Sequence, residues 1–300
     1  MQDPASTPLF RRVVVVLDHS SDQAKILGSA ASLARRLDAE VLALFAEDRR
    51  LEKLEEHPFA RVIDLPTGLG HNVARGSMQR HCRALVRRTR RRLAHLGRDY
   101  QIQTYFEPLT GDIAEDLRQR LGPSDLLLVE RGKHQLSSSR PVASRSRLHR
   151  EQILCPVLVS GKASPMRSVV VLYDGSSLAR HGLDTALHLG ARRSVMVTLA
   201  LVGASDEANR GLREEAARQI GERGAQIELH IRRIIERSPE TIAAVSSNVH
   251  AQLLIIPDDE SRFVDSVDGL TERLACPVLV MRGSDREVDD RSRREVAMER

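Results

Sequence analysis

An internal repeat constrains the fold of this chain more than any other feature. The segment from Arg11 to Phe45, RRVVVVLDHSSDQAKILGSAASLARRLDAEVLALF, matches the segment from Arg167 to Leu201, RSVVVLYDGSSLARHGLDTALHLGARRSVMVTLAL. Near the end of each copy, LCPVLV (Leu154 to Val159) matches ACPVLV (Ala275 to Val280). A chain of 300 residues with one such repeat is typical of two similar domains of ordinary size.

Each copy contains five short runs rich in β-branched residues, separated by segments with helical spacing. In the first copy the expected strands are Val13–Leu17, Val41–Ala46, Ile102–Glu107, Leu126–Val129 and Val157–Val159. In the second copy they are Val169–Tyr173, Val195–Leu201, Ile227–Ile231, Leu253–Ile256 and Val278–Met281. Strands that alternate with helices predict βαβ units, so we expect the α/β class with open, five-stranded parallel sheets covered by helices on both faces.

The spacing of the repeated motifs predicts the domain boundaries. Asp18 and Cys155 are 137 positions apart, whereas the matching Asp174 and Cys276 are 102 positions apart, so the first copy is about 35 residues longer. Most of the excess falls in residues 47–80, which we interpret as an inserted surface loop. The expected domains are residues 1–162 and 163–283, followed by a charged tail at 284–300.

The two matching aspartates, Asp18 and Asp174, follow the first strand of each copy directly. Open parallel sheets bind ligands at the carboxyl ends of their strands, so both residues are candidates for a binding site. The serines that follow each aspartate are typical of a helix start, and a carboxylate there can stabilise the turn. A ligand-binding role and a capping role therefore both remain open.

The sequence resembles the universal stress protein family. The resemblance rests on Asp174-Gly175-Ser176 after the first strand, its weaker counterpart Asp18-His19-Ser20, and a last strand written CPVLV in both copies. It covers about 260 of the 300 residues. It implies two Rossmann-like domains, of the adenine nucleotide alpha hydrolase-like kind, that pair through their final strands. Two domains without a mutual interface are the alternative.

The same resemblance implies how a nucleotide is bound. Family members that bind ATP share Gly-x2-Gly-x9-Gly-Ser/Thr after the fourth strand, and the matching positions in the first copy hold Glu130, Lys133, Ala143 and Ser144. Only the serine is retained, so we expect a degenerate site with impaired ATP binding and no resident cofactor. The remnants of the nucleotide site would be Asp18, Lys133, Ser144 and Asp174.

The second copy departs further from the family pattern. Its loop after the fourth strand is about six residues shorter and begins with Asp258, Asp259 and Glu260. Three carboxylates would repel a triphosphate in the absence of a metal ion. We interpret the run as a solvated turn and the second copy as a nucleotide-poor pseudosite.

The run HCRALVRRTRRRLAHLGR, from His81 to Arg98, is the strongest electrostatic feature of the sequence. On a helix, Leu85, Leu93 and Leu96 would face the sheet. The candidate anion patch on neighbouring rows of that helix consists of Arg83, Arg87, Arg90 and Arg91. Residues 1–162 hold 27 Lys and Arg against 19 Asp and Glu, so an anionic partner would prefer the first half.

Two interpretations of this arginine helix remain open. It could bind nucleic-acid phosphates or anionic lipid through its cations. Because no aromatic residues are interleaved for base stacking, we favour a solvated face and do not expect nucleic acid as a partner.

Other function classes lack supporting motifs. The sequence contains no GxSxG, GxxxxGK[ST] or HExxH motif and no CxxC pair, so we expect neither an enzyme nor a metal site. No apolar run approaches the length of a membrane span, and we expect a cytoplasmic chain with no membrane partner. Cys82, Cys155 and Cys276 are expected to be reduced and buried.

The sequence thus leads to three functional hypotheses. The first is a tandem universal stress protein that acts as a non-catalytic stress-response or regulatory binding protein, with an unidentified protein partner and compatible with homodimer formation. The second is an ATP-binding form or weak ATPase that uses the first copy. The third is a polyanion-binding module that uses the helix around Arg83–Arg92.

Overall fold

The computed structural model describes residues 9–18, 23–46, 61–63, 70–72, 77–109, 113–129, 155–160, 167–190, 195–203, 205–222, 228–234, 238–258 and 264–283. The elements of the first half are β1 (Arg12–Leu17), α1 (Gln23–Leu37), β2 (Glu40–Ala46), β3 (Arg61–Ile63), β4 (Gly70–Asn72), α3 (Ser77–Tyr100), β5 (Thr104–Leu109), α4 (Ile113–Arg120), β6 (Asp125–Val129) and β7 (Val157–Val159). Those of the second half are β8 (Ser168–Tyr173), α5 (Ser177–Gly190), β9 (Met196–Val202), α6 (Asp206–Glu222), β10 (Glu228–Ile234), α7 (Pro239–Asn248), β11 (Leu253–Pro257), α8 (Val264–Arg273) and β12 (Val278–Met281).

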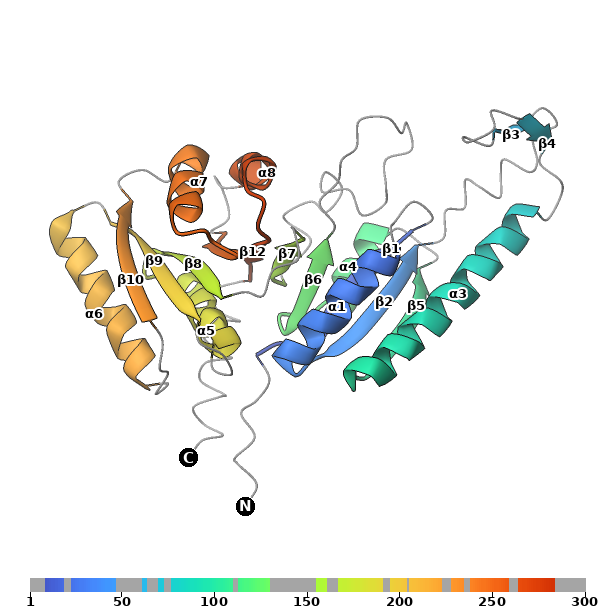
Figure 1. Ribbon diagram of the computed structural model, residues 1–300, viewed down its shortest axis with the longest axis horizontal. Coiled ribbons are helices and arrows are strands. Elements are labelled where there is room, and N and C mark those ends of the chain that lie inside the picture. Colours follow the sequence, from blue (N-terminus) through green and yellow to red (C-terminus); the bar gives the residue numbers. More distant parts are fainter. Residues whose placement is uncertain are drawn as a thin grey trace, which may run out of the picture.

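One sheet of ten strands runs through both halves, with the order β10-β9-β8-β11-β12-β7-β6-β1-β2-β5 (Figure 1). Each half contributes five parallel strands to this sheet. The order β5-β2-β1-β6-β7 in the first half corresponds to β10-β9-β8-β11-β12 in the second. The halves meet at β7 and β12, which pair antiparallel with Leu158 opposite Leu279. Because of this antiparallel join, the strands of the two halves run in opposite directions, and their carboxyl ends point to opposite sides of the molecule.

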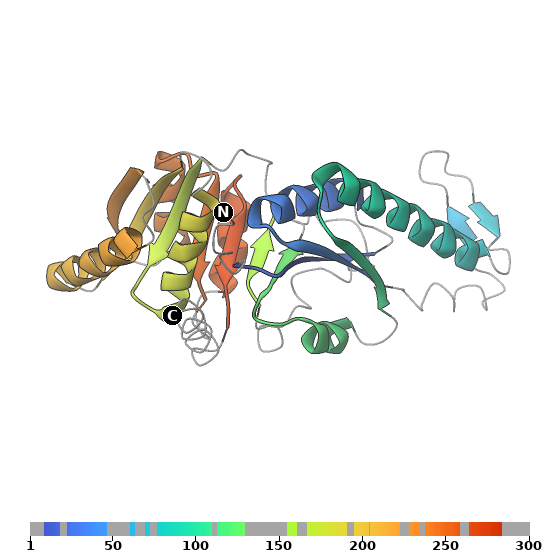
Figure 2. The ribbon, with the colours of Figure 1, turned by 90° about the horizontal axis from the view of Figure 1, so that it is seen from below.

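The helices cover both faces of this sheet. Buried residues of α1, α3, α5 and α6 share one apolar cluster with one face of the strands. On the opposite face, α4 covers the first half and α7 and α8 cover the second. Figure 2 shows α1 and α3 on one side of the first-half strands and α4 on the other. The central strands are therefore buried on both faces, which is why β1 and β8 are apolar almost throughout.

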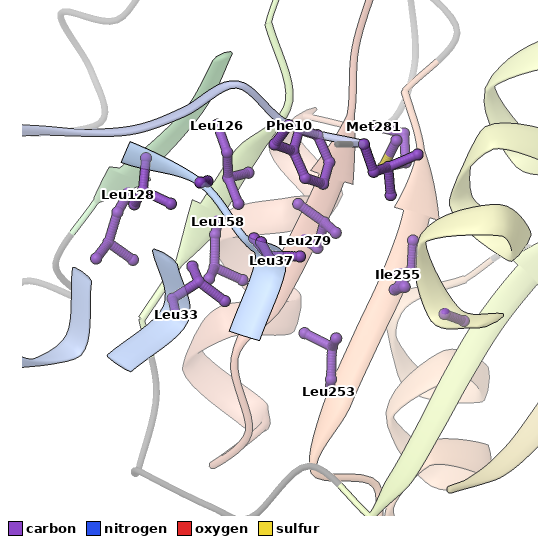
Figure 3. Close-up of a cluster of buried hydrophobic side chains, with 14 of the residues drawn as sticks. Phe10, Leu33, Leu37, Leu126, Leu128, Leu158, Leu253, Ile255, Leu279 and Met281 are labelled. Atoms are coloured by element: carbon purple, nitrogen blue, oxygen red, sulfur yellow. The ribbon is translucent and has the colours of Figure 1, made fainter. Parts of the chain in front are cut away.

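The apolar core continues across the join between the halves. Figure 3 shows Leu126 and Leu158 of the first half beside Leu253 and Leu279 of the second. Phe10 also crosses the join, since its ring stacks on His181 of α5 at a centroid distance of 6.2 Å. A void of about 10 Å³, no larger than one water molecule, lies within this packing. On this face of the sheet the two halves consequently share one apolar cluster, whereas on the opposite face each half has a cluster of its own.

The structure confirms the predicted α/β class and most of the strands. Val157–Val159 and Val278–Met281 form strands with the expected bounds. Ser238 caps α7, since its hydroxyl accepts a hydrogen bond from the Thr241 amide at 3.2 Å. The edge strand β5 lies two residues later than expected.

Residues 47–80, interpreted as a loop, contain regular structure. β3 and β4 pair antiparallel within this segment, and α3 already begins at Ser77. The tail at 284–300 lies outside the described residues.

Candidate functional site

Each half has a point where the strand order reverses. β1 connects through α1 to β2 on one side and has β6 as its other neighbour, and β8 stands between β9 and β11 in the same way. Open α/β sheets bind ligands in the crevice outside the carboxyl ends of the strands at such a point. The candidate sites therefore lie beyond β1 and β6 in one half, and beyond β8 and β11 in the other.

Two aspartates stand side by side at the second-half crevice. Val171 of β8 pairs with Ile255 of β11, and Asp174 and Asp258 each follow three residues later along their strands. The parallel register thus brings both carboxylates to the mouth of one crevice. Their hydrogen bonds decide whether they are available to a ligand.

The carboxylate of Asp174 stabilises the turn into α5. Its Oδ1 accepts hydrogen bonds from the Ser176 amide at 3.0 Å and from the Ser176 hydroxyl at 2.6 Å. The same hydroxyl accepts from the Ala179 amide at 3.2 Å and so caps the helix. Gly175 between them has φ of 80°, a left-handed conformation that glycine adopts readily. Asp174 therefore has the turn-stabilising contacts of the capping interpretation.

Asp258 forms a buried ion pair with Arg282. The Nε of Arg282 donates to Oδ2 of Asp258 at 3.0 Å, and the exposed fractions of the two side chains are 13% and 7% respectively. The interpretation of Asp258 as a solvated turn carboxylate is therefore wrong. The cause lies in the sheet, because Pro257 pairs with Met281 and the next residue of each strand is one member of the ion pair. Asp259 and Glu260 lie outside the described residues.

A second polar network links β8 to the helices above it. Tyr173, the fully buried last residue of β8, donates its hydroxyl to Oε1 of Glu215 on α6 at 2.9 Å. Arg180 of α5 donates its Nε to the same oxygen at 2.6 Å. Burial raises the pKa of Tyr173, and its hydrogen bond to Glu215 raises it further. Although burial acts in the opposite direction, the bonds from Arg180 and Tyr173 lower the pKa of Glu215.

α6 also packs closely over the turn that follows β8. A Cβ atom placed on Gly175 would come within 2.7 Å of Cδ2 of Leu212 and 3.6 Å of Oε2 of Glu215. Further along, Asn209 donates to the carbonyl oxygen of Gly203 at 3.3 Å, at the end of β9. Side chains of α6 therefore occupy the space beside the Asp174 turn.

In the first-half crevice the structure describes the residue that follows β1 but not the residues that follow β6. Asp18 follows β1 and is only 5% exposed, and its backbone carbonyl accepts a hydrogen bond from Nε2 of Gln23 at 3.2 Å. The Gln23 side chain also accepts from the hydroxyl of Thr89, so it joins the end of β1 to α3. Leu17 stands where the second half has Tyr173, so the tyrosine–glutamate bond has no counterpart at that position.

The other predicted nucleotide-site residues cannot be placed relative to Asp18. Lys133 and Ser144, together with Glu130 and Ala143, lie outside the described residues. Their grouping with Asp18 stays a prediction from the sequence.

The predicted arginine helix is present as α3, although its residues differ in their surroundings. Arg83, Arg87 and Arg91 are exposed. Arg90 is exposed too, but it also lies over the ring of Phe106 on β5, with its guanidinium carbon 4.9 Å from the ring centroid. Leu93 is buried, while Leu85 and Leu96 pack partly buried against the core, as the helical spacing predicts. Arg90 thus also fixes α3 to the edge strand.

Sequence reasoning missed several polar residues of the second half. Nothing in the sequence pairs Tyr173 with Glu215, although a tyrosine that ends an aliphatic run was an available signal. One other expectation needs correction, because Cys82 is only partly buried. The sequence also contains no sign that His181 stacks on Phe10.

The described residues contain no group of three His, Cys, Asp or Glu side chains that would hold a metal ion. Within the same part of the chain, every helix is too short or too polar to cross a membrane.

Comparisons with known proteins identify the fold. No protein-family model and no curated protein matches this sequence. Among solved structures, a universal stress protein from Archaeoglobus fulgidus DSM 4304 is similar with a TM-score of 0.62 and 17% identity, covering 92% of this chain and 99% of that one. A chain from Pseudomonas aeruginosa UCBPP-PA14, provisionally described as a universal stress protein, gives a TM-score of 0.57 and 17% identity, covering 96% and 98%.

The same fold also occurs in another kind of protein. The cytoplasmic domain of a prokaryotic cation chloride cotransporter is similar with a TM-score of 0.54 and 11% identity, covering 92% of this chain and 96% of that one. At these identities the likenesses establish a common fold, that of the universal stress proteins. A shared fold does not determine function, so the function of this chain depends on the residues at its candidate sites.

Proposed function

We propose that this chain is a tandem universal stress protein that acts by binding a partner protein in a stress response, without catalysis and with impaired ATP binding. Two independent observations support the family: the repeated Asp-x-Ser and CPVLV motifs of the sequence, and the common fold over 92% of the chain. The domain division at residues 1–162 and 163–283 and a cytoplasmic location belong to the same proposal.

The proposal of impaired ATP binding rests on the contacts that the second-half crevice already makes within the protein. There the Asp174 carboxylate is engaged by Ser176, and the Asp258 carboxylate is neutralised by Arg282. Leu212 lies against the Gly175 turn, where a ligand would approach the backbone. A nucleotide would have to disrupt these contacts before it could bind, which costs free energy that a preformed site would not require.

The first half supports a second candidate function, that of an ATP-binding protein or weak ATPase. Its crevice has Leu17 in place of Tyr173, and α1 and α3 are linked by the neutral pair of Gln23 and Thr89. Asp18, Lys133 and Ser144 would then bind the nucleotide. This candidate differs from the main proposal in one measurable property, specific stabilisation by ATP.

The test is the thermal midpoint of the protein with and without millimolar ATP and magnesium, with inorganic triphosphate as the charge control. A ligand that binds the native state at 100 times its Kd stabilises it by about 2.7 kcal/mol. We expect no rise specific to ATP. A specific rise that disappears in Asp18→Asn and persists in Asp174→Asn would establish the second candidate instead.

A further inference from the structure

The outer face of α3 carries a row of cations that the proposed function does not use. α3 buries one face, through Thr89 and Leu93. Four arginines follow one another on the opposite face at spacings of four, four and seven residues, and we call them the arginine stripe: Arg83, Arg87, Arg91 and Arg98. Such spacings keep side chains on one side of a helix.

The stripe has no neutralising partners in the described part of the chain. All four side chains belong to exposed residues, and the ion pairs of the described residues do not include them. From Ser77 to Tyr100 the helix contains eight arginines and one acidic residue, Asp99, which pairs with His95. The cations therefore add to one another and produce a strong local positive potential.

The position of α3 makes the stripe accessible. Figures 1 and 2 show α3 at the outer end of the molecule, next to the edge strand β5 and continuing past the strands toward β3 and β4. Arg83 and Arg98 are 15 positions apart, so the stripe is about 22 Å long at a rise of 1.5 Å per residue. Arg90 over Phe106 holds the helix against the sheet, so the stripe is presented on a fixed support.

The chemistry of this face selects among anionic partners. Interfacial helices insert an apolar face into lipid, but the apolar face of α3 is packed into the protein core. Protein interfaces have an apolar centre, whereas the residues between the stripe arginines on this face are the small Ala84 and Ala94. Single-stranded nucleic acid is bound through aromatic stacking, and no Phe, Tyr or Trp lies between Arg83 and Arg98.

After lipid, protein and single-stranded nucleic acid are excluded, the remaining partner is a regular row of phosphates that the stripe contacts through charge alone. We propose that the arginine stripe binds the phosphate backbone of a nucleic-acid duplex without sequence preference. Guanidinium groups bind phosphate oxygens in a bidentate manner, and this helix uses arginine without any lysine. At 3.4 Å per base pair, the stripe matches about six base pairs. This inference is independent of the proposed function, and it revises the expectation of a solvated face.

The test measures binding of a fluorescent 24-base-pair duplex of arbitrary sequence between 50 and 200 mM salt. Four phosphate contacts give a slope of about −3.6 in log K against log salt, or about a 150-fold loss of affinity over this range. In R83Q/R87Q/R91Q we expect the slope to fall to about −0.9 and the loss to about 3.5-fold. Arg90 is retained in this variant because it packs on Phe106.

The matched control is R210Q/R213Q/R232Q, which removes the same charge from exposed arginines of the second half. We expect its binding curve to equal that of the wild type, and both variants to keep the wild-type thermal midpoint within a few degrees because surface substitutions change stability little. Absence of duplex binding at 50 mM salt, or equal effects of the two variants, would overturn the proposal. So would stripe-dependent binding to phosphatidylglycerol vesicles with no binding to the duplex.

Discussion

The hydroxyl of Tyr173 donates a hydrogen bond of 2.9 Å to Oε1 of Glu215, and through it the last residue of a central strand is tied to α6. Arg180 donates to the same oxygen from α5. The network lies directly before the Asp174 turn, where a ligand of this fold would be expected. A position suited to binding is thus used to stabilise the second half.

The charge of Glu215 makes this stabilisation depend on pH. Its pKa in the folded state is below the ordinary value of 4.5, so its contribution is present above pH 4.5 and is lost as the pH falls through the lowered pKa. In Glu215→Gln this contribution is absent at every pH. We therefore expect the wild type and the variant to differ in urea midpoint at pH 7 and to converge toward pH 3. A difference that is the same at both pH values would contradict the ion-pair assignment.

The tyrosine can be tested separately from the charge. Tyr173→Phe removes the hydroxyl but keeps the buried ring, and Glu215 keeps its bond to Arg180. We expect a loss of about 1.5 kcal/mol in the free energy of unfolding, typical of a hydrogen bond to a charged group. Tyr105→Phe is the matched control, because Tyr105 is 45% exposed and its substitution should change stability little. Equal losses in the two variants would show that the bond to Glu215 does not contribute.

Removal of one member of the Asp258–Arg282 pair should be costly. Asp258→Ala leaves a guanidinium that is only 13% exposed without its partner, and such a change typically costs about 3–5 kcal/mol. We expect Asp258→Leu combined with Arg282→Met to recover most of this loss, since two apolar side chains require no charge partner. Urea unfolding of Asp258→Leu, of Arg282→Met and of the double variant measures the coupling. Additive effects would show that the two residues act independently.

The shared core predicts that both halves unfold together. Leu158 and Leu279 face each other across the antiparallel join and are 5% and 3% exposed. Leu279→Ala should cost about 3 kcal/mol, because it removes buried methyl groups and leaves a cavity. We expect one calorimetric transition that moves to lower temperature as a whole. Two separate transitions would indicate that the halves are stable independently.

The cysteines should differ in reactivity. Burial raises the pKa of Cys155 to about 12, so almost no thiolate is present at pH 8. Cys276 is also buried, whereas Cys82 is only partly so. A thiol reagent at pH 8 should modify one cysteine in the native chain and three after denaturation, and Cys82→Ser should abolish the native reaction. Fast modification of Cys82→Ser would contradict the burial of the other two.

The sequence predicted the strands of this fold where periodicity and burial agree. Val157–Val159 and Val278–Met281 are fully buried, and their apolar runs end where the strands end. The edge strand was predicted two residues early because β5 is exposed or only partly buried as far as Pro108, so no continuous apolar run marks its bounds. It also continues through Pro108, which an edge strand tolerates because one side of its backbone is unpaired.

The polar contacts of the site could not be predicted in the same way. Asp258 and Arg282 are 24 positions apart and meet only because β11 and β12 pair in one particular register. Asp174 was identified from the sequence as a candidate, but its bonds to Ser176 depend on the left-handed conformation of Gly175. Pairings of this kind follow from tertiary structure, and a local pattern does not contain them.

Calorimetric titration of the chain with ATP and magnesium tests the central claim most directly, because it counts the binding sites. We predict no saturable, ATP-specific heat up to millimolar concentration, in the wild type and in Asp174→Asn alike. A site with micromolar affinity that Asp174→Asn weakens and Asp18→Asn leaves unchanged would show that the second-half crevice binds nucleotide. That result would contradict the assignment of Asp174 and its neighbours to a structural role.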